Sequence, residues 1–258
     1  MTVLNTERVG STLVLTLNRP EAMNALSSAL VQALTEQIDA AAAVADIRSI
    51  VITGAGEKAF CAGTDLKERR TLSAKQKWAQ SRGGWHLNQA IHRSPKAVVA
   101  AIGGWCLGGG FELALYCDLR IAADDARFGW PEMTLGAYPG SGAALMLPRL
   151  IGPAQAKLLF FTARRIDAAQ AQQIGLVQAV VSRAELLARA LALCDEMNAT
   201  SPLGLAAVKR SINEGADLPL AQAAELDQSL RRPLEATQDY EEGIRAHFEK
   251  RKPVFTGR

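Results

Sequence analysis

Histidine and cysteine, the usual ligands of zinc and the residues of thiol redox sites, are scarce in this chain of 258 residues. The complete set is His86, His92, His247, Cys61, Cys106, Cys117 and Cys194. The histidines are scattered, and the cysteines form neither a paired zinc pattern nor a dense disulfide framework. We therefore expect no metal site, and reduced thiols in a cytoplasmic compartment.

An excess of charge of one sign is also lacking, because 29 basic residues face 26 acidic ones for a net charge of +3. A nucleic-acid partner is not expected from so mild a balance. The longest apolar stretch, residues 97–111, is short for a membrane span, is broken by glycines and precedes Glu112. Residues 1–10 show neither a basic nor an apolar leader segment. Membrane attachment and secretion are therefore not expected.

What the chain does contain is apolar residues, 48% of the total, in a pattern that alternates between strands and helices. The alternation lasts to residue 182, and only helical patterns follow, which predicts an α/β body with an all-helical tail. Residues 58–67 predict a loop, and the polar stretch 69–94 predicts a mobile helix or lid. The expected strands are 12–17, 47–53, 97–102, 119–123 and 177–181. The expected helices are 27–45, 154–161, 168–174, 184–198, 203–213 and 220–250.

The most informative segment is residues 103–118, GGWCLGGGFELALYCD, which follows an apolar strand. Glycines at 108–110 let backbone N–H groups approach a ligand, and the helix start that follows has N–H groups without partners. The small-residue loop 60–66, FCAGTDL, has the same property. The amides of Thr64 and Gly109 can therefore point at one oxygen and form an oxyanion hole.

Two carboxylates accompany these amides. Glu112 lies three residues after Gly109 and shares its helix face. Glu132 lies in an apolar, turn-rich segment that should raise its pKa. A pair of carboxyl groups beside an oxyanion hole suits proton transfer at the carbons α and β to a carbonyl.

Simpler readings and rival functions are weighed against this one. Glu112 could simply cap its helix, Glu132 could be a solvated turn residue, and Cys61 and Cys106 are interpreted as packing residues.

A dinucleotide-binding fold is not supported, because Leu113 stands where the last glycine of its motif belongs. A hydrolase using Ser141 lacks the nucleophile-elbow spacing, and a non-catalytic binding role does not explain two glutamates.

Five ordered motifs resemble the enoyl-CoA hydratase/isomerase (crotonase) family over essentially the whole chain. They are residues 18–20 with 24–26, 59–67, 107–118, 131–136 and 249–251. The resemblance implies an α/β fold, the crotonase (ClpP-like) spiral of ββα units with an all-helical C-terminal trimerisation region. It implies a spiral core over residues 1–195 with the CoA groove, and an oligomerisation region over residues 196–258.

The resemblance also implies the chemistry. The substrate would be an acyl-CoA thioester, with no metal or redox cofactor, and the protein would assemble as a trimer or a dimer of trimers. Thr64 and Gly109 would hold the thioester oxygen, Glu132 would be the main acid/base, and Glu112 would orient the water. Residues implied to bind CoA or substrate are Met23, Ala25, Ala62, Thr64, Asp65, Leu66, Lys67, Gly108, Gly109, Trp130, Tyr138 and Lys250.

The acyl pocket departs from the family pattern. A common Gly-Gly-Thr-Gln-Arg-Leu run is here residues 142–147, GAALML. Trp130 and Tyr138 add bulk beside Glu132, and Trp78 to Trp85 are expected to contribute to the acyl pocket. Enoyl-CoA hydration is the function that the residues favour, and Δ3–Δ2 enoyl-CoA isomerisation and a carnitinyl-CoA-type dehydration stay open. Acyl length, branching and ring content are not predicted.

Overall fold

The computed structural model describes residues 2–258 and is built around a six-stranded sheet. The strands adjoin in the order β1-β2-β3-β5-β7-β10; β1 is antiparallel to β2, and all other neighbours are parallel. Their bounds are β1 Leu4–Val9, β2 Thr12–Leu17, β3 Ser49–Gly54, β5 Ala97–Ile102, β7 Leu119–Ala123 and β10 Ala179–Val181. The polar edge strand β1 was missed by the sequence prediction because its outer side chains are exposed and give no apolar alternation.

A second sheet of short strands lies beside the first, in the order β4-β6-β8-β9. Its members are β4 Ala59–Cys61, β6 Trp105–Leu107, β8 Arg127–Gly129 and β9 Ile166–Asp167. Strands β3, β5 and β7 of the large sheet are each followed by a strand of the small sheet and then by a helix. This repetition is the predicted ββα spiral. Residues 58–67 were predicted to be a loop, but they contain β4. The prediction missed this strand because a segment of three residues is too short to show the alternation of a strand.

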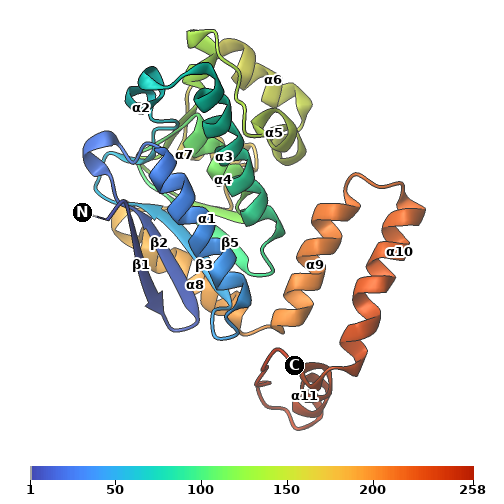
Figure 1. The fold of residues 1–258 in the computed structure, drawn as a ribbon. Coiled ribbons are helices and arrows are strands. Elements are labelled where there is room, and N and C mark those ends of the chain that lie inside the picture. The colour runs from blue at the N-terminus through green and yellow to red at the C-terminus, as the bar shows by residue number, and fades with distance from the viewer. Residues whose placement is uncertain (1) are drawn as a thin grey trace.

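Helices cover both faces of the large sheet (Figure 1), and alternate residues of its strands belong to two separate apolar clusters. Leu15, Ile52 and Ala100 point to the layer covered by α1 Ser28–Ala43 and α3 Ala74–Arg93. Val14, Val51 and Val99 point to the layer covered by α8 Leu186–Asn198. This is the two-residue period of a strand buried on both faces. Because α8 covers the sheet, the extended tail begins after it.

Helix α3 confirms the helical alternative predicted for residues 69–94, and the mobility of this stretch stays a prediction. It is a continuous 20-residue helix, begun by a capping box between Ser73 and Gln76. Three buried residues, Leu87, Asn88 and Ile91, attach its second half to the body. The remaining body elements are η1 Pro20–Ala22, α2 Leu66–Thr71, η2 Pro131–Leu135, α5 Ala143–Ile151, α6 Pro153–Thr162, α7 Ala168–Gln173 and η3 Arg183–Glu185.

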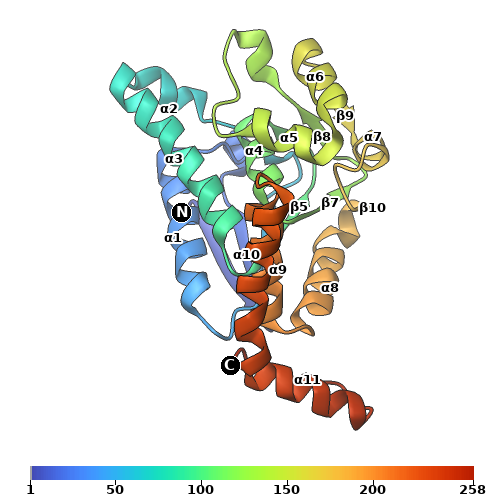
Figure 2. The ribbon, with the colours of Figure 1, turned by 90° about the vertical axis from the view of Figure 1, so that its right-hand side faces the viewer.

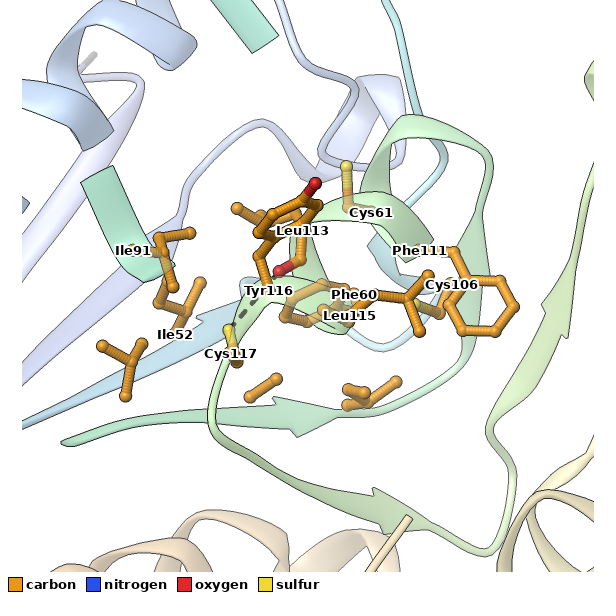
Figure 3. Close-up of a cluster of buried hydrophobic side chains, with 14 of the residues drawn as sticks. Ile52, Phe60, Cys61, Ile91, Cys106, Phe111, Leu113, Leu115, Tyr116 and Cys117 are labelled. Carbon is orange, nitrogen blue, oxygen red and sulfur yellow. Dashed lines mark hydrogen bonds between the residues drawn. The ribbon is translucent and has the colours of Figure 1, made fainter. Parts of the chain in front are cut away.

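Helix α4 Gly109–Tyr116 is buried at every residue. Figure 3 shows apolar side chains of this helix, among them Phe111 and Leu115, in one buried cluster with neighbours such as Phe60. The thiols of Cys61 and Cys106 lie in the same cluster, and burial raises the pKa of the Cys61 thiol to about 12. Burial also raises the pKa of the Cys106 thiol, so both thiols stay protonated and serve as packing residues.

The tail is an antiparallel helix pair (Figure 1) followed by a third helix (Figure 2). Its elements are α9 Pro202–Gly215, α10 Leu220–Arg231, η4 Arg232–Ala236 and α11 Gln238–Phe248. A single helix over 220–250 was predicted, and this was wrong. Pro233 lies in the 3-10 turn η4 and Thr237 caps a new helix, accepting a hydrogen bond from the Tyr240 amide at 3.1 Å. No helix in residues 2–258 is long and apolar enough to cross a membrane.

Candidate active site

The glycine-rich turn between β6 and α4 places the start of α4 at the bottom of a cavity. Gly108 has φ +50° and ψ −124°, a conformation that glycine adopts readily. A side chain at this position would also overlap the Glu132 carboxyl group. Gly108 therefore lets the backbone turn while Glu132 lies directly against it.

Two backbone amides meet at this turn. Gly109 is the first residue of α4, so its N–H has no partner within the helix. The Thr64 loop is held on both sides: the Leu26 amide donates to the Gly63 oxygen at 2.8 Å, and the Asp65 amide donates to the Leu26 oxygen at 3.1 Å. The Thr64 N–H has no hydrogen-bond acceptor within residues 2–258. A methyl group at Gly109 would lie 3.4 Å from the Thr64 nitrogen, so the two amides are close together.

An ion pair that the sequence reading did not assign supports the Thr64 loop. Arg19 donates to the Asp65 carboxylate at 2.8 Å and to the Ala25 oxygen at 2.7 Å. Asp65 also accepts the Lys67 and Glu68 amides as the cap of α2. Burial raises the pKa of Asp65, but the Glu68 amide and the Arg19 guanidinium lower it more strongly, so the net shift is downward. Asp65 is therefore an ionised structural residue of the loop.

Glu112 is only 3% exposed and is held by backbone amides. Its Oε1 accepts the Ser141 amide at 2.8 Å and the Ala143 amide at 3.3 Å. Burial raises its pKa to about 7, the two amides oppose the rise, and the charge of Glu132 adds to it. Glu112 therefore changes its protonation state near neutral pH.

Glu132 is the second residue of the 3-10 turn η2, and its side chain reaches the start of α4. Burial raises its pKa, and its own amide and the Gly109 amide oppose the rise. Its Oε2 is buried and has no hydrogen-bond partner in the part of the chain that the structure describes. A buried acceptor without a partner is rare in proteins, and a water or substrate would satisfy it.

The raised pKa of Glu112 makes protein stability depend on pH. Below about pH 4.5 the carboxyl group is protonated in both the folded and the unfolded chain. Between about 4.5 and 7 the unfolded chain releases the proton and the folded chain keeps it, so the free energy of unfolding falls as pH rises. We expect Glu112→Gln to be more stable than the wild type at pH 8 by on the order of 2 kcal/mol, with little difference at pH 4.5.

Urea unfolding of both proteins at pH 4.5 and pH 8 measures this difference. The exposed Glu57, replaced by glutamine, is the matched control and should follow the wild type at both pH values. Equal pH dependence in Glu112→Gln and the wild type would contradict the expectation.

Both glutamates and both amides line one cavity of about 160 Å³. Its walls come from α2, α3, the start of α4 and the segment 131–141. Leu66, Leu135 and Tyr138 line it while remaining largely exposed, so apolar side chains surround its opening. The site combines two buried carboxyl groups with paired N–H donors in a space for a small acyl group.

The comparisons agree with this geometry. A sequence model described as enoyl-CoA hydratase/isomerase matches residues 7–258. The chain belongs to the enoyl-CoA hydratase/isomerase family. It is 41% identical over 245 residues to a crotonyl-CoA hydratase of Syntrophomonas wolfei, covering 94% of this chain and 93% of that protein. It is 41% identical over 244 residues to a putative enoyl-CoA hydratase/isomerase of Bacillus subtilis, covering 95% and 94%.

The solved structures show the same relation. The fold matches an enoyl-CoA hydratase of Bacillus anthracis with a TM-score of 0.97 and 36% identity, covering 99% of this chain and 100% of that one. The predicted crotonase fold is confirmed.

Most of the family residues expected at the site lie at or beside the cavity. Ala62, Thr64, Leu66, Gly109, Glu112, Glu132 and Tyr138 line it. The others on neighbouring segments are Met23, Ala25, Asp65, Lys67 and Gly108, none of which lines the cavity. Met23 is linked to the cavity wall because its oxygen accepts the Ala62 amide at 3.0 Å.

Trp130 is a correction, because it is a core residue and not a wall of the cavity. It is 1% exposed and stacks on Phe111 with ring centroids 4.5 Å apart and planes at 16°. The ring of Phe160 packs against Trp130 as well, with centroids 4.9 Å apart and planes at 38°. The two aromatic partners of Trp130 lie on α4 and α6, which are distant from it in sequence. The sequence therefore contained no indication that Trp130 packs against them.

Other expected pocket residues also lie elsewhere. Lys250 follows α11 at the far end of the tail from α2 and α5 (Figure 1) and does not line the cavity of its own chain. The stretch 78–85 is confirmed in part, because Gln80, Ser81 and Gly84 line the cavity. Its two tryptophans do not: Trp85 packs edge-on against Tyr116 with ring centroids 6.3 Å apart, and Trp78 is 69% exposed. Residues 143–147 form the start of α5, and none of them lines the cavity.

Residues missed from the sequence are those that position Glu112. The Ser141 amide binds its carboxylate, and Asn88 on α3 donates to the Ser141 oxygen at 2.9 Å. The Ser141 contact could not have been predicted, because any residue type can supply a backbone amide. Asn88 could have been identified only as a polar residue among the apolar positions of α3.

Proposed function

We propose that this family member is an enoyl-CoA hydratase, a hydro-lyase that adds water reversibly to a 2-enoyl-CoA thioester. The observation that carries the proposal is the pairing of Glu112 and Glu132, both with raised pKa, beside the amides of Thr64 and Gly109. The relative named crotonyl-CoA hydratase supports the substrate class.

The proposed mechanism uses groups in these positions. The Thr64 and Gly109 N–H groups donate to the thioester oxygen and stabilise the negative charge that it gains. Glu112 orients a water molecule through the carboxylate oxygen that the two amides leave unused. Glu132 takes a proton from this water as its oxygen bonds to the β-carbon. The double-bond electrons move toward the α-carbon and carbonyl, and Glu132 then returns a proton to the α-carbon.

The site as proposed needs no metal or redox cofactor, because CoA is part of the substrate. Met23, Ala25, Ala62, Asp65, Leu66 and Lys67 are proposed to line the CoA groove. Lys250 could reach CoA only in another copy of the chain, given its position on the tail.

Self-association into a trimer or a dimer of trimers is proposed for the tail. The tail exposes large apolar side chains to water: Ile212 is 65% exposed, Leu220 86% and Phe248 80%. This exposure is unfavourable, and contact with another copy of the chain would bury these side chains. A cytoplasmic location is proposed from the four free, buried cysteines.

The direct test is hydration of crotonyl-CoA by the purified protein. We expect loss of the absorbance of the conjugated thioester and formation of 3-hydroxybutyryl-CoA, identified by mass spectrometry. Failure to hydrate any 2-enoyl-CoA, together with failure to bind butyryl-CoA in calorimetry, would refute the proposal.

A further inference from the structure

An arginine without an acidic partner lines the catalytic cavity. Arg69 is half-buried on α2 and lines the same space as Glu112 and Glu132. Its Nη1 donates to the Lys77 oxygen at 3.2 Å, to Gln80 Oε1 at 3.0 Å and to Ser81 Oγ at 3.5 Å. Across residues 2–258, Nε and Nη2 make no hydrogen bond and no carboxylate lies within 4.0 Å of the guanidinium. Its charge is therefore available to a ligand.

Helix α3 connects Arg69 with the catalytic end of the cavity. The stripe that lines the cavity is Gln80, Ser81, Gly84, Leu87 and Asn88. Arg69 contacts the first two, and Asn88 binds the segment whose Ser141 amide holds Glu112. Seven residues of helix separate Ser81 from Asn88, a rise of about 10 Å.

The cavity suits a short acyl group. A cavity of about 150 Å³ holds benzene in another protein, and this one is about 160 Å³. A five-carbon acyl chain extends about 5 Å from its thioester carbon, and a charge-assisted hydrogen bond adds about 2.8 Å. Arg69 and Glu112 line the same cavity, so a short acyl group with its β-carbon near Glu112 occupies the space that Arg69 also faces.

We propose, on the basis of the hydratase function above, that the enoyl group of the substrate carries a carboxylate at its far end, which Arg69 binds. A guanidinium presents parallel N–H donors that match a carboxylate. An alkyl end would instead remove water from the charged group without replacing its hydrogen bonds, which is unfavourable. The substrate class is thus a short enoyl-CoA derived from a dicarboxylic acid.

A matched substrate pair tests the proposal. Glutaconyl-CoA and trans-2-pentenoyl-CoA have five acyl carbons and differ in a terminal carboxylate or methyl group. The wild type should favour glutaconyl-CoA in kcat/KM by at least about tenfold, and Arg69→Met should lose about 10- to 100-fold on glutaconyl-CoA alone. Arg69→Lys should recover part of the loss. Arg70→Met, an exposed neighbour on α2, is the control and should match the wild type.

Binding of glutaryl-CoA and valeryl-CoA, measured by calorimetry, separates this proposal from the hydratase function, since neither ligand reacts. Selective weakening of glutaryl-CoA in Arg69→Met supports the proposal even if no enoyl-CoA is hydrated. Equal weakening of both ligands would mean that Arg69 binds a CoA phosphate, and no change in either would mean a structural role; each result would overturn it. Hydration of pentenoyl-CoA without any preference for the carboxylate would also overturn it and leave the hydratase function intact.

Discussion

Replacement of Glu132 by glutamine is expected to lower kcat for crotonyl-CoA hydration by at least about a thousandfold. Glutamine preserves the shape of the side chain but can neither accept the proton of water nor deliver one to the α-carbon. Glu132 lies against Gly108 and the Gly109 amide, next to the place proposed for the thioester oxygen. Steady-state kinetics give kcat, and the KM should change little because the CoA contacts remain.

The fold should survive this change, which makes the result interpretable. Circular dichroism and the binding of butyryl-CoA should match the wild type. A Glu132→Gln protein that keeps more than about a tenth of the wild-type kcat would remove Glu132 from the acid/base role.

Replacement of Glu112 by glutamine is expected to lower kcat by about a hundredfold or more. The amide oxygen can still accept the Ser141 and Ala143 N–H groups. The group facing the water then becomes an NH₂ donor, which cannot accept a hydrogen bond from the attacking water. Because the buried charge is also removed, the same variant should gain stability at pH 8, so activity and stability should move in opposite directions.

The Glu112→Gln variant also distinguishes hydration from isomerisation. Migration of a double bond from the 3- to the 2-position needs a base and an oxyanion hole but no oriented water. If the protein is mainly an isomerase, Glu112→Gln should keep its rate on 3-hexenoyl-CoA. If the wild type does not isomerise 3-hexenoyl-CoA and Glu112→Gln loses the hydration of crotonyl-CoA, the addition of water is the main reaction.

The two carboxyl groups differ through their surroundings. Glu112 is fixed by two amides of the segment 141–143, whereas Glu132 leaves one buried oxygen without a partner. A fixed carboxylate suits the holding of a water molecule. An unsatisfied carboxyl group beside the paired amides suits proton transfer to and from a bound ligand.

The sequence by itself determined the family, through its ordered motifs, and the identity of the candidate glutamates and amides; the spiral of ββα units was what the family resemblance implied. These features depend on local order: strand, glycine turn and helix follow one another within residues 97–116, and their spacing is visible along the chain. Helices with strong caps, such as α1 after Ser27, were located for the same reason.

Only the tertiary structure decided which side chains face the cavity. Trp130 and Tyr138 are both aromatic residues close to Glu132 in sequence, yet one is stacked in the core and the other is 73% exposed at the cavity. Arg69, Asn88 and Ser141 joined the site because α2, α3 and the segment 131–141 pack around one space. Residue type specifies what a side chain can do, but its partners come from segments distant in sequence, and packing alone brings them together.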